Sequence, residues 1–259
     1  MIKLKNVERI FAFGCSFTKY YWPTWADVIA SEVPEANFLN FGICGGGNLS
    51  IVSRMVEANQ RFKFNNRDLV VIMWTTMCRE DRWVTSRNGW AMTGNIFTQS
   101  DYSMEFVEKW CDPKGYLIRD LSLISLATQF LQNLKCQTLL LPSVPFDYQQ
   151  DETDKSIQSI LKIYDNILSL YPKSLLELEL NYIFDNTTYY KEGHDGIWED
   201  YHPTTLRYRN YLEKINLPLT DKSKKFALES LEKLQDSKTL DEISKNFNNL
   251  FYKDNNILL

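Results

Sequence analysis

The chain has 259 residues, of which 44% are hydrophobic and 14% aromatic, enough to bury the core of one large domain or of a domain with an appendage. Its formal net charge is −4 and its pI is near 5.4, so no overall positive field attracts nucleic acid or anionic lipid. No segment approaches the roughly 20 apolar residues that span a bilayer, and the first residues lack the apolar run of a signal peptide. We therefore expect a cytoplasmic protein that binds neither nucleic acid nor membrane.

The five cysteines are scattered along the chain and show no C-x-x-C spacing. This pattern indicates reduced thiols and favours neither a disulfide framework nor a zinc site. We expect no metal or organic cofactor.

Short apolar segments alternate with amphipathic segments through the first two thirds of the chain. Four strands are predicted, over 9–13, 37–41, 69–74 and 138–142, with a weaker one near 175–183. Helices are predicted after Pro23 and over about 49–62, 102–110, 116–134 and 153–171. Strands separated by helices at this spacing imply βαβ crossovers, and so an α/β fold whose parallel sheet is covered on both faces.

Two regions depart from this alternation. Residues 77–101 are polar and lack a clear period, which indicates an insertion or lid within a domain spanning 1–218. The segment 219–259 is rich in Lys, Glu and Asp and contains two amphipathic stretches, so we interpret it as a helical C-terminal appendage. We expect its helices to pack on the domain surface; the alternative is an arm that forms a homo-oligomer.

The first candidate loop is Gly14-Cys15-Ser16-Phe17-Thr18, directly after the first predicted strand. In an open parallel sheet, reactive groups gather at the carboxyl ends of the strands. A serine there has backbone N–H groups nearby that could stabilise an oxyanion. A serine after a strand is also a common helix cap or turn former, so this loop alone does not establish a nucleophile.

A glycine cluster at 42–47 follows the second predicted strand. Consecutive glycines let the backbone approach a ligand closely and present N–H groups in unusual directions. The alternative is a flexible turn capped by Asn48. The cluster does not match a phosphate-binding loop, because it contains no G-K-[ST] and does not complete G-x-G-x-x-G.

The chain has only two histidines, His194 and His202. Histidine is the usual general base near neutral pH. Glu199 and Asp200 precede His202 by three and two residues, and either could fix its tautomer through Nδ1. A lone histidine is usually structural, but these acidic neighbours and Pro203, which suits a first helical turn, make a catalytic role an equal alternative.

Together these three segments resemble the conserved blocks of the SGNH (GDSL-type) hydrolases over about residues 8–217. Gly14-Cys15-Ser16-Phe17-Thr18 resembles the first block, Asn40-Phe41-Gly42-Ile43-Cys44-Gly45 the second, and Glu199-Asp200-Tyr201-His202-Pro203 the last. The resemblance implies a flavodoxin-like three-layer α/β/α sandwich and serine-based cleavage of small acyl esters, often acetyl esters on carbohydrates.

The resemblance also implies roles for single residues. Ser16 is the expected nucleophile and His202 its base, with Glu199 orienting the imidazole and Asp200 as a competitor for that role. The N–H groups of Ser16 and Gly45 are the expected oxyanion donors. Cys15 replaces the aspartate of the family's first block, and a cysteine nucleophile there is a weaker alternative.

The family's third block, G-x-N-D, is absent, and Trp74-Thr75-Thr76 stands in its place. The hydroxyl of Thr75 or Thr76 could replace the missing Asn amide as an oxyanion donor. Losing one such donor typically costs about 10²–10³ in turnover.

The insertion supplies further candidates for substrate binding. Arg79 and Arg82 could bind an anionic group. Trp83, with other aromatic residues of the insertion, could form a wall on which a sugar stacks.

The leading hypothesis is a serine esterase or deacetylase that acts on a small-molecule or carbohydrate ester. Two alternatives use the same residues differently. An acyltransferase would resolve the same acyl-enzyme with a sugar hydroxyl, and a catalytically silent module would only bind a glycan or a protein.

Overall fold

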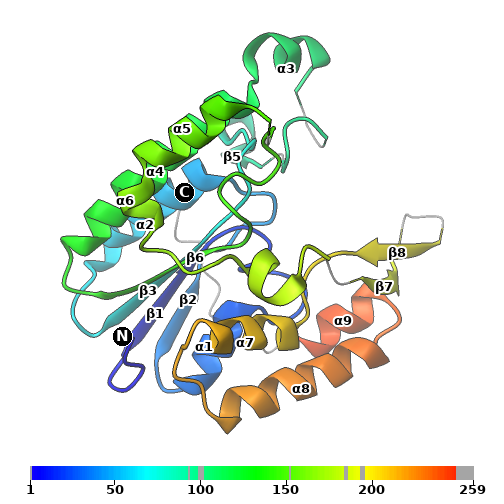
Figure 1. Ribbon diagram of the computed structural model, residues 1–259. Helices are drawn as coiled ribbons and strands as arrows, with labels where there is room; N and C mark the ends of the chain where they lie inside the picture. The colour runs from blue at the N-terminus through cyan, green and yellow to red at the C-terminus, as the bar shows by residue number, and fades with distance from the viewer. Residues whose placement is uncertain are drawn as a thin grey trace.

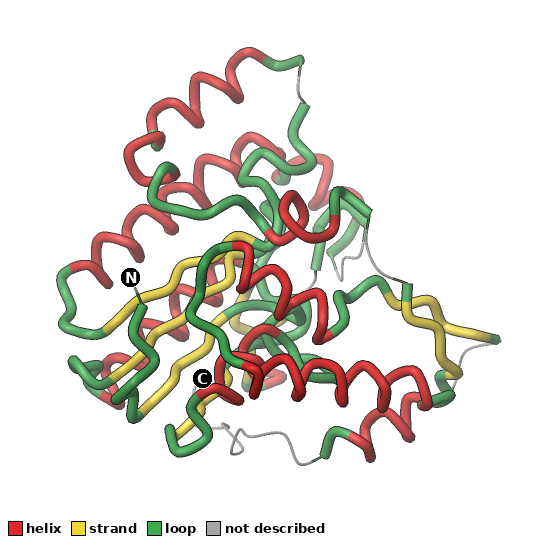
Figure 2. Tube along the Cα trace, turned by 60° about the horizontal axis from the view of Figure 1, so that its bottom comes forward, coloured by secondary structure: helices red, strands yellow, loops and turns green. Residues whose placement is uncertain are grey.

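The computed structural model describes residues 2–92, 94–98, 102–151, 153–183, 186–192 and 196–248. Its centre is a four-stranded parallel sheet with the strand order β2-β1-β3-β6 (Figures 1 and 2). These strands are β1 (Arg9–Phe13), β2 (Asn37–Asn40), β3 (Asp68–Trp74) and β6 (Gln137–Pro142). The four strands predicted with a strong signal are therefore confirmed.

The central strand β3 is buried at every position, because helices cover both faces of the sheet. Successive side chains of a strand point to opposite faces. Leu69, Val71 and Met73 accordingly belong to one core cluster. The alternate residues, Val70 and Ile72, belong to the other core cluster. A continuous apolar strand is thus what a sheet buried on both sides requires.

The helices form the two outer layers (Figure 1). One core cluster joins the sheet to α1 (Trp25–Glu32) and α7 (Thr205–Lys214). The other cluster joins it to α2 (Asn48–Phe62), α4 (Pro113–Gln132) and α5 (Lys155–Ile163). The chain is therefore a three-layer α/β/α sandwich of flavodoxin-like strand order, as expected.

Two helices follow the sandwich at the C-terminal end. Helix α8 (Asp221–Asp236) packs against α1 and α7, and α9 (Leu240–Asn246) contacts α8 (Figure 1). The described part of the predicted appendage thus packs on the surface of the domain. Residues 249–259 of that appendage lie outside the described residues, as does His194.

Smaller elements fill the connections. They are β4 (Arg82–Val84), η1 (Thr85–Arg87), β5 (Gly89–Ala91), α3 (Met104–Trp110), α6 (Asp165–Leu168), η2 (Leu176–Leu180), β7 (Thr187–Tyr190) and β8 (Ile197–Asp200). The pairs β4–β5 and β7–β8 are antiparallel hairpins, neither of which was predicted. Of the helices in the described ranges, none combines the length and apolar character that a membrane crossing needs.

The weak strand predicted near 175–183 is wrong. This segment contains η2, a short π-helix, in which Leu176 and Leu180 are buried in the core. The Ser174 hydroxyl accepts a hydrogen bond from the N–H of Glu177 at 3.2 Å, which is how a serine caps the start of a helical turn. The single helix predicted over 153–171 is also interrupted, because α5 ends at Ile163 and α6 begins at Asp165.

Helix α1 buries a carboxyl group behind the loop that follows β1. Thr24 and Asp27 form a capping box, in which the Thr24 N–H donates to Asp27 Oδ2 at 2.8 Å. Asp27 is 1% exposed, and among the described residues its Oδ1 has no hydrogen-bond partner. Burial raises the pKa of Asp27 to about 7, because the apolar surroundings disfavour the carboxylate.

We expect the substitution Asp27→Asn to flatten the dependence of stability on pH. An unfolded aspartate ionises near pH 3.9, whereas the folded one ionises at about 7, so between these values folding takes up a proton. The free energy of unfolding of the wild type should therefore fall as the pH rises from about 4 to 7 and then level off. Melting temperatures measured from pH 5 to 8 should show a steeper decline in the wild type than in Asp27→Asn. The exposed Asp236→Asn is the control and should follow the wild type; a parallel course of Asp27→Asn and the wild type would contradict the prediction.

Candidate active site

Ser16 lies in the tight turn that leaves the carboxyl end of β1. The Thr18 N–H donates to the carbonyl of Cys15 at 2.9 Å, which closes the turn. A Cβ atom at Gly14 would lie 1.9 Å from Thr18 Oγ1, so only glycine fits where the strand enters the turn. Ser16 is consequently held at the edge of the sheet, with 7% of its surface exposed.

His202 lies between β8 and α7, nearly two hundred residues away in the chain. Two hydrogen bonds attach its segment to the loop after Ser16. The Trp22 Nε1–H donates to the Pro203 carbonyl at 3.0 Å, and the Thr205 hydroxyl donates to the Pro23 carbonyl at 2.7 Å. These buried bonds bring the first and last candidate loops of the sequence together.

Ser16, His202 and Asp200 form a hydrogen-bonded chain. The Ser16 Oγ lies 2.8 Å from His202 Nε2, and His202 Nδ1 lies 2.7 Å from Asp200 Oδ1. Because an ionised carboxylate only accepts hydrogen bonds, Nδ1 carries the proton and Nε2 is left as the acceptor for the Ser16 hydroxyl. This is the arrangement in which an imidazole can deprotonate a serine.

Asp200 is buried, and three side chains satisfy its carboxylate. His202 occupies Oδ1, while the hydroxyls of Tyr20 and Tyr189 both donate to Oδ2, the latter at 2.7 Å. Burial opposes ionisation of Asp200, but the hydrogen bonds from His202 and Tyr20 outweigh it and lower the pKa of Asp200. Asp200 therefore remains a carboxylate that can stabilise a protonated His202.

Glu199, the residue expected to orient the imidazole, does not contact it. Its carboxylate accepts a hydrogen bond from the Tyr201 hydroxyl at 2.7 Å and is exposed. The two residues neighbour each other in β8, where successive side chains point to opposite faces. Since Asp200 points to His202, Glu199 points away from it.

Aromatic rings fix the His202 imidazole from several sides. The Tyr20 ring stacks on it with ring centroids 3.7 Å apart and an interplanar angle of 18°. Phe17 meets it edge-on at 5.3 Å. These contacts exclude water from much of the ring and restrict its rotation.

The second candidate loop supplies backbone donors. Gly45 has φ +76°, a left-handed conformation that favours glycine. Among the described residues, the N–H groups of Gly45 and Ser16 have no hydrogen-bond acceptor, and both residues line the same cavity. The loop is held from behind by Asp81, which accepts from the N–H groups of Gly47 and Ser50 at 2.9 and 3.0 Å.

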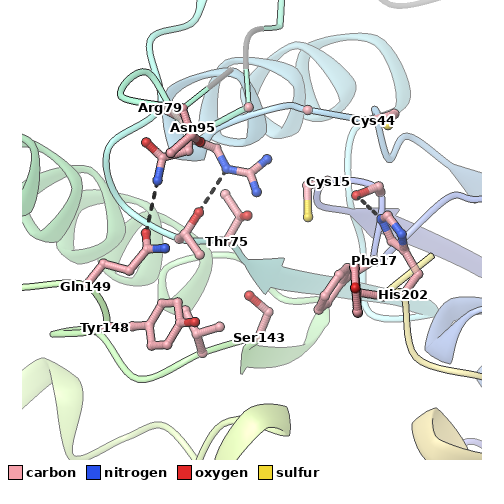
Figure 3. A pocket seen from close by; sticks show the side chains of 17 residues that line it. Cys15, Phe17, Cys44, Thr75, Arg79, Asn95, Ser143, Tyr148, Gln149 and His202 are labelled. Carbon is pink, nitrogen blue, oxygen red and sulfur yellow. Dashed lines mark hydrogen bonds between the residues drawn. The ribbon is translucent and has the colours of Figure 1, made fainter. Parts of the chain in front are cut away.

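Thr75 and Thr76 follow β3 at the position of the missing third block. The Asn48 side chain holds the Thr75 backbone at both ends, since Oδ1 accepts from the Thr75 N–H at 3.0 Å and Nδ2 donates to its carbonyl at 3.3 Å. Asn48 is itself held by Asp120, 2.9 Å away. The Thr76 hydroxyl accepts from Arg79 Nε at 3.0 Å. The Thr75 hydroxyl has no hydrogen bond to a described residue and points into the cavity (Figure 3).

A cavity of about 540 Å³, called here the Ser16 cavity, opens in front of these groups. His202 lies at one end of the cavity and Arg79 and Asn95 lie at the other (Figure 3). Ser16, which is hydrogen-bonded to His202, also lines the cavity. The Arg79 guanidinium donates to the Gly46 carbonyl at 3.0 Å and forms no ion pair with a described carboxylate. It is therefore a fixed positive charge facing the cavity.

Arg82 and Trp83, the other predicted substrate-binding residues, do not line the Ser16 cavity. Arg82 pairs with Glu80 at 2.9 Å and lies over the Phe106 ring at 5.0 Å. Trp83 packs edge-on against Trp90 across the β4–β5 hairpin. Trp83 and Trp90 therefore contact each other and do not line the cavity.

Several residues of the site were not predicted from the sequence. Ser143, Tyr148 and Gln149 line the Ser16 cavity from the segment after β6. Ser143 directly follows a strand, so the rule that drew attention to Ser16 could have found it. Nothing in the local sequence marks Tyr189 as a partner of Asp200, because the hairpin that carries it was not predicted.

The thiols near the nucleophile have different environments. Cys15 is buried, whereas Cys44 is exposed at the rim of the cavity. Partial desolvation at the cavity rim raises the pKa of the Cys44 thiol, which keeps it protonated and weakly nucleophilic near neutral pH. Over the described ranges, no group of three His, Cys, Asp or Glu side chains converges in a way that could hold a metal ion.

Comparison with solved structures finds lipolytic proteins of the G-D-S-L family and an acetylxylan esterase. A member of the lipolytic protein G-D-S-L family from Veillonella parvula is 14% identical, covers 82% of this chain and 99% of its own, and has a TM-score of 0.44. A catalytic mutant of Axe2, an acetylxylan esterase from Geobacillus stearothermophilus, is 16% identical, covers 81% of this chain and 94% of its own, and has a TM-score of 0.43. No protein-family model and no curated protein matches the chain. At this level of similarity the neighbours carry no argument for an activity or a substrate. The function of this chain is therefore argued from its own residues.

We expect Asp200→Asn and Glu199→Gln to differ sharply in their effect on the reactivity of Ser16 towards an ester probe. An amide at position 200 can donate to Nδ1 and favours the wrong imidazole tautomer, so turnover of 4-nitrophenyl acetate should fall by about 10²–10⁴. Glu199→Gln should stay within about twofold, because Glu199 does not contact His202. Melting temperatures of both variants control for folding, and a larger loss in Glu199→Gln would refute this assignment of the carboxylates.

Proposed function

We propose that the chain is a serine esterase that cleaves small acyl esters through an acyl-enzyme on Ser16. The observation that carries this proposal is the hydrogen-bonded chain Ser16–His202–Asp200 at the end of a cavity large enough for a small ester. Placing an ionised carboxylate and an imidazole in partly buried positions destabilises the fold, because both lose hydration. Such hydrogen-bonded groups therefore occur mainly at functional sites.

The proposed reaction has two halves. His202 Nε2 takes the Ser16 proton as Oγ attacks the ester carbonyl, and the same proton then passes to the oxygen of the departing alcohol. A water molecule, deprotonated by His202, next attacks the acyl-enzyme, which releases the acid and restores Ser16. Throughout, the Asp200 carboxylate stabilises the imidazolium.

The oxyanion formed in each half needs donors that are already in place. We assign this role to the N–H groups of Ser16 and Gly45 and to the hydroxyl of Thr75. Support comes from their lack of other acceptors among the described residues and from their position on the Ser16 cavity. The Arg79 guanidinium adds positive potential and is the residue proposed to bind an anionic part of the substrate.

Labelling with a fluorophosphonate probe tests the proposed nucleophile. The wild type should be labelled at Ser16, as mapped by mass spectrometry, and both Ser16→Ala and His202→Ala should lose labelling because one lacks the nucleophile and the other its base. Ser143→Ala, which removes another serine hydroxyl from the wall of the same cavity, is the matched control and should be labelled like the wild type. A folded wild type that resists labelling would contradict an esterase and favour a catalytically silent binding module.

Valine substitutions at Thr75 and Thr76 test the third oxyanion donor. Valine keeps the shape of threonine but removes the hydroxyl, so Thr75→Val should lower kcat for 4-nitrophenyl acetate by about 10²-fold with little change in KM. Thr76→Val removes an acceptor of Arg79 instead and should cost less than tenfold. The reverse order of effects would assign the donor to Thr76.

A further inference from the structure

The glycine-rich loop after β2 is hydrogen-bonded to the segment that follows β3, which was predicted to be an insertion or lid. The Gly94 N–H donates to the Gly45 carbonyl at 3.2 Å. The Arg79 guanidinium donates to the next carbonyl, that of Gly46, at 3.0 Å. The two peptide groups that follow the N–H of Gly45 are therefore each bonded to the same segment.

Asp81, from this segment, caps the helix into which the loop leads. Helix α2 begins at Asn48, and its N-cap residue, Gly47, has no side chain with which to cap it. Asp81 instead accepts from the Gly47 N–H at 2.9 Å and from the Ser50 N–H at 3.0 Å. It is 3% exposed, and a carboxylate at this position also interacts favourably with the helix dipole. The segment after β3 thus supplies the cap that α2 lacks.

Steric contact between the two segments explains why one position of the cluster is glycine. A Cβ atom at Gly47 would lie 2.7 Å from Asp81 Oδ2 and 2.8 Å from Arg79 Cβ, distances at which atoms overlap. A Cβ atom at Gly45 would lie 3.2 Å from the Met92 carbonyl oxygen. Gly47 therefore makes room for Asp81 and Arg79 and not for a ligand.

These contacts restrict the direction of the Gly45 N–H. Glycine adopts a wider range of φ and ψ than any other residue, so a free run of three glycines would present its N–H groups in many directions. The bonds at Gly45, Gly46 and Gly47 remove this freedom. A donor to an oxyanion lowers the barrier most when it is already oriented as the charge forms.

We propose that Asp81 and Arg79 are positioning residues for the oxyanion donor Gly45. The proposal rests on the esterase function proposed above and adds a role for the segment after β3, which holds the donor loop in place. Asp81 acts only through the backbone of the loop, because it does not line the Ser16 cavity. Arg79 does line the cavity, so its effect on the loop must be separated from any effect on the substrate.

The substitution Asp81→Asn tests the proposal in the full chain. Asparagine has nearly the same size, but it has one acceptor oxygen where the carboxylate uses two, and it turns an N–H₂ group toward the N–H groups of Gly47 and Ser50. We expect kcat for 4-nitrophenyl acetate to fall about tenfold with KM within about twofold, because the Gly45 N–H is displaced but not removed.

An inhibitor that forms an oxyanion separates positioning from general destabilisation. The Ser16 Oγ adds to the carbonyl of 1,1,1-trifluoroacetone, the serine proton passes to His202, and the carbonyl oxygen becomes the oxyanion. Asp81→Asn should weaken this inhibition by the same factor by which it lowers kcat/KM. The pH at which kcat/KM is half-maximal should not move, because the hydrogen bonds of His202 to Ser16 and Asp200 are intact.

Asp154→Asn is the matched control. Asp154 caps α5 by accepting from the Ser156 N–H at 2.8 Å, as Asp81 caps α2, but α5 contributes no residue to the Ser16 cavity. This variant should keep the wild-type kcat and the wild-type affinity for 1,1,1-trifluoroacetone. Melting temperatures of both variants control for folding.

The substitution Arg79→Lys keeps the proposal testable if Asp81→Asn does not fold. Lysine keeps the charge but lacks the planar fork with which Arg79 donates to the Gly46 carbonyl and to the Thr76 hydroxyl at once. Because 4-nitrophenyl acetate carries no anionic group, a role in substrate binding alone predicts an unchanged kcat. Positioning predicts a fall in kcat of about tenfold.

Two results would overturn the inference while leaving the esterase intact. One is an active wild type whose kcat for 4-nitrophenyl acetate is unchanged in Asp81→Asn and Arg79→Lys. The other is a fall in kcat without a matching loss of inhibition by 1,1,1-trifluoroacetone, which would make the two residues merely structural.

Hydrogen exchange over residues 43–50, measured by mass spectrometry, gives a readout that needs no ester. Asp81→Asn should exchange faster there than the wild type and Asp154→Asn, because the N–H groups of the loop lose their acceptor. If no ester is hydrolysed but exchange behaves as expected, the esterase proposal falls and the hold of Asp81 on the loop stands. Unchanged exchange in Asp81→Asn would overturn that hold.

Discussion

The attachment of the segment around His202 to the loop after β1 is the constraint on which the site depends. Two buried hydrogen bonds, Trp22 to Pro203 and Thr205 to Pro23, make this attachment. Each joins a side chain of one segment to a backbone carbonyl of the other, so neither segment can shift without leaving a buried polar group unsatisfied. The bonds lie one and three residues after His202 and six and seven residues after Ser16, so they hold the segments that carry the nucleophile and the base against each other.

A buried carboxylate creates the second constraint. Asp200 loses most of its hydration when it is buried. Hydrogen bonds from the Tyr20 hydroxyl, the Tyr189 hydroxyl and the His202 ring replace those from water. Tyr189 comes from the β7–β8 hairpin, so this hairpin stabilises the charge behind His202. The catalytic base therefore depends on a hairpin that lies outside the central sheet.

The region of the missing third block is supported by polar groups beneath it. Asn48 holds Thr75 by both of its backbone groups, and Asp120 holds Asn48. Arg119 pairs with Asp120 at 2.7 Å and donates to the Arg79 carbonyl. The same network therefore positions Arg79, whose guanidinium lines the Ser16 cavity. Because these groups are buried and hydrogen-bonded, the loop keeps one conformation, which is what a donor to an oxyanion requires.

The sequence by itself determined the sheet and its layers, because a strand such as β3, which is apolar from Leu69 to Trp74, occurs only when both faces are covered. It also indicated Ser16, since reactive groups follow strands in this architecture. It indicated His202 by its acidic neighbours and by the proline that follows it. It could not decide between Glu199 and Asp200, which are adjacent in one strand and differ only in the face to which they point. Nor could it find Tyr189, because the hairpin that carries it has little apolar periodicity and is defined by contacts with distant residues. Local pattern thus gave the elements, and tertiary packing alone decided which side chains face one another.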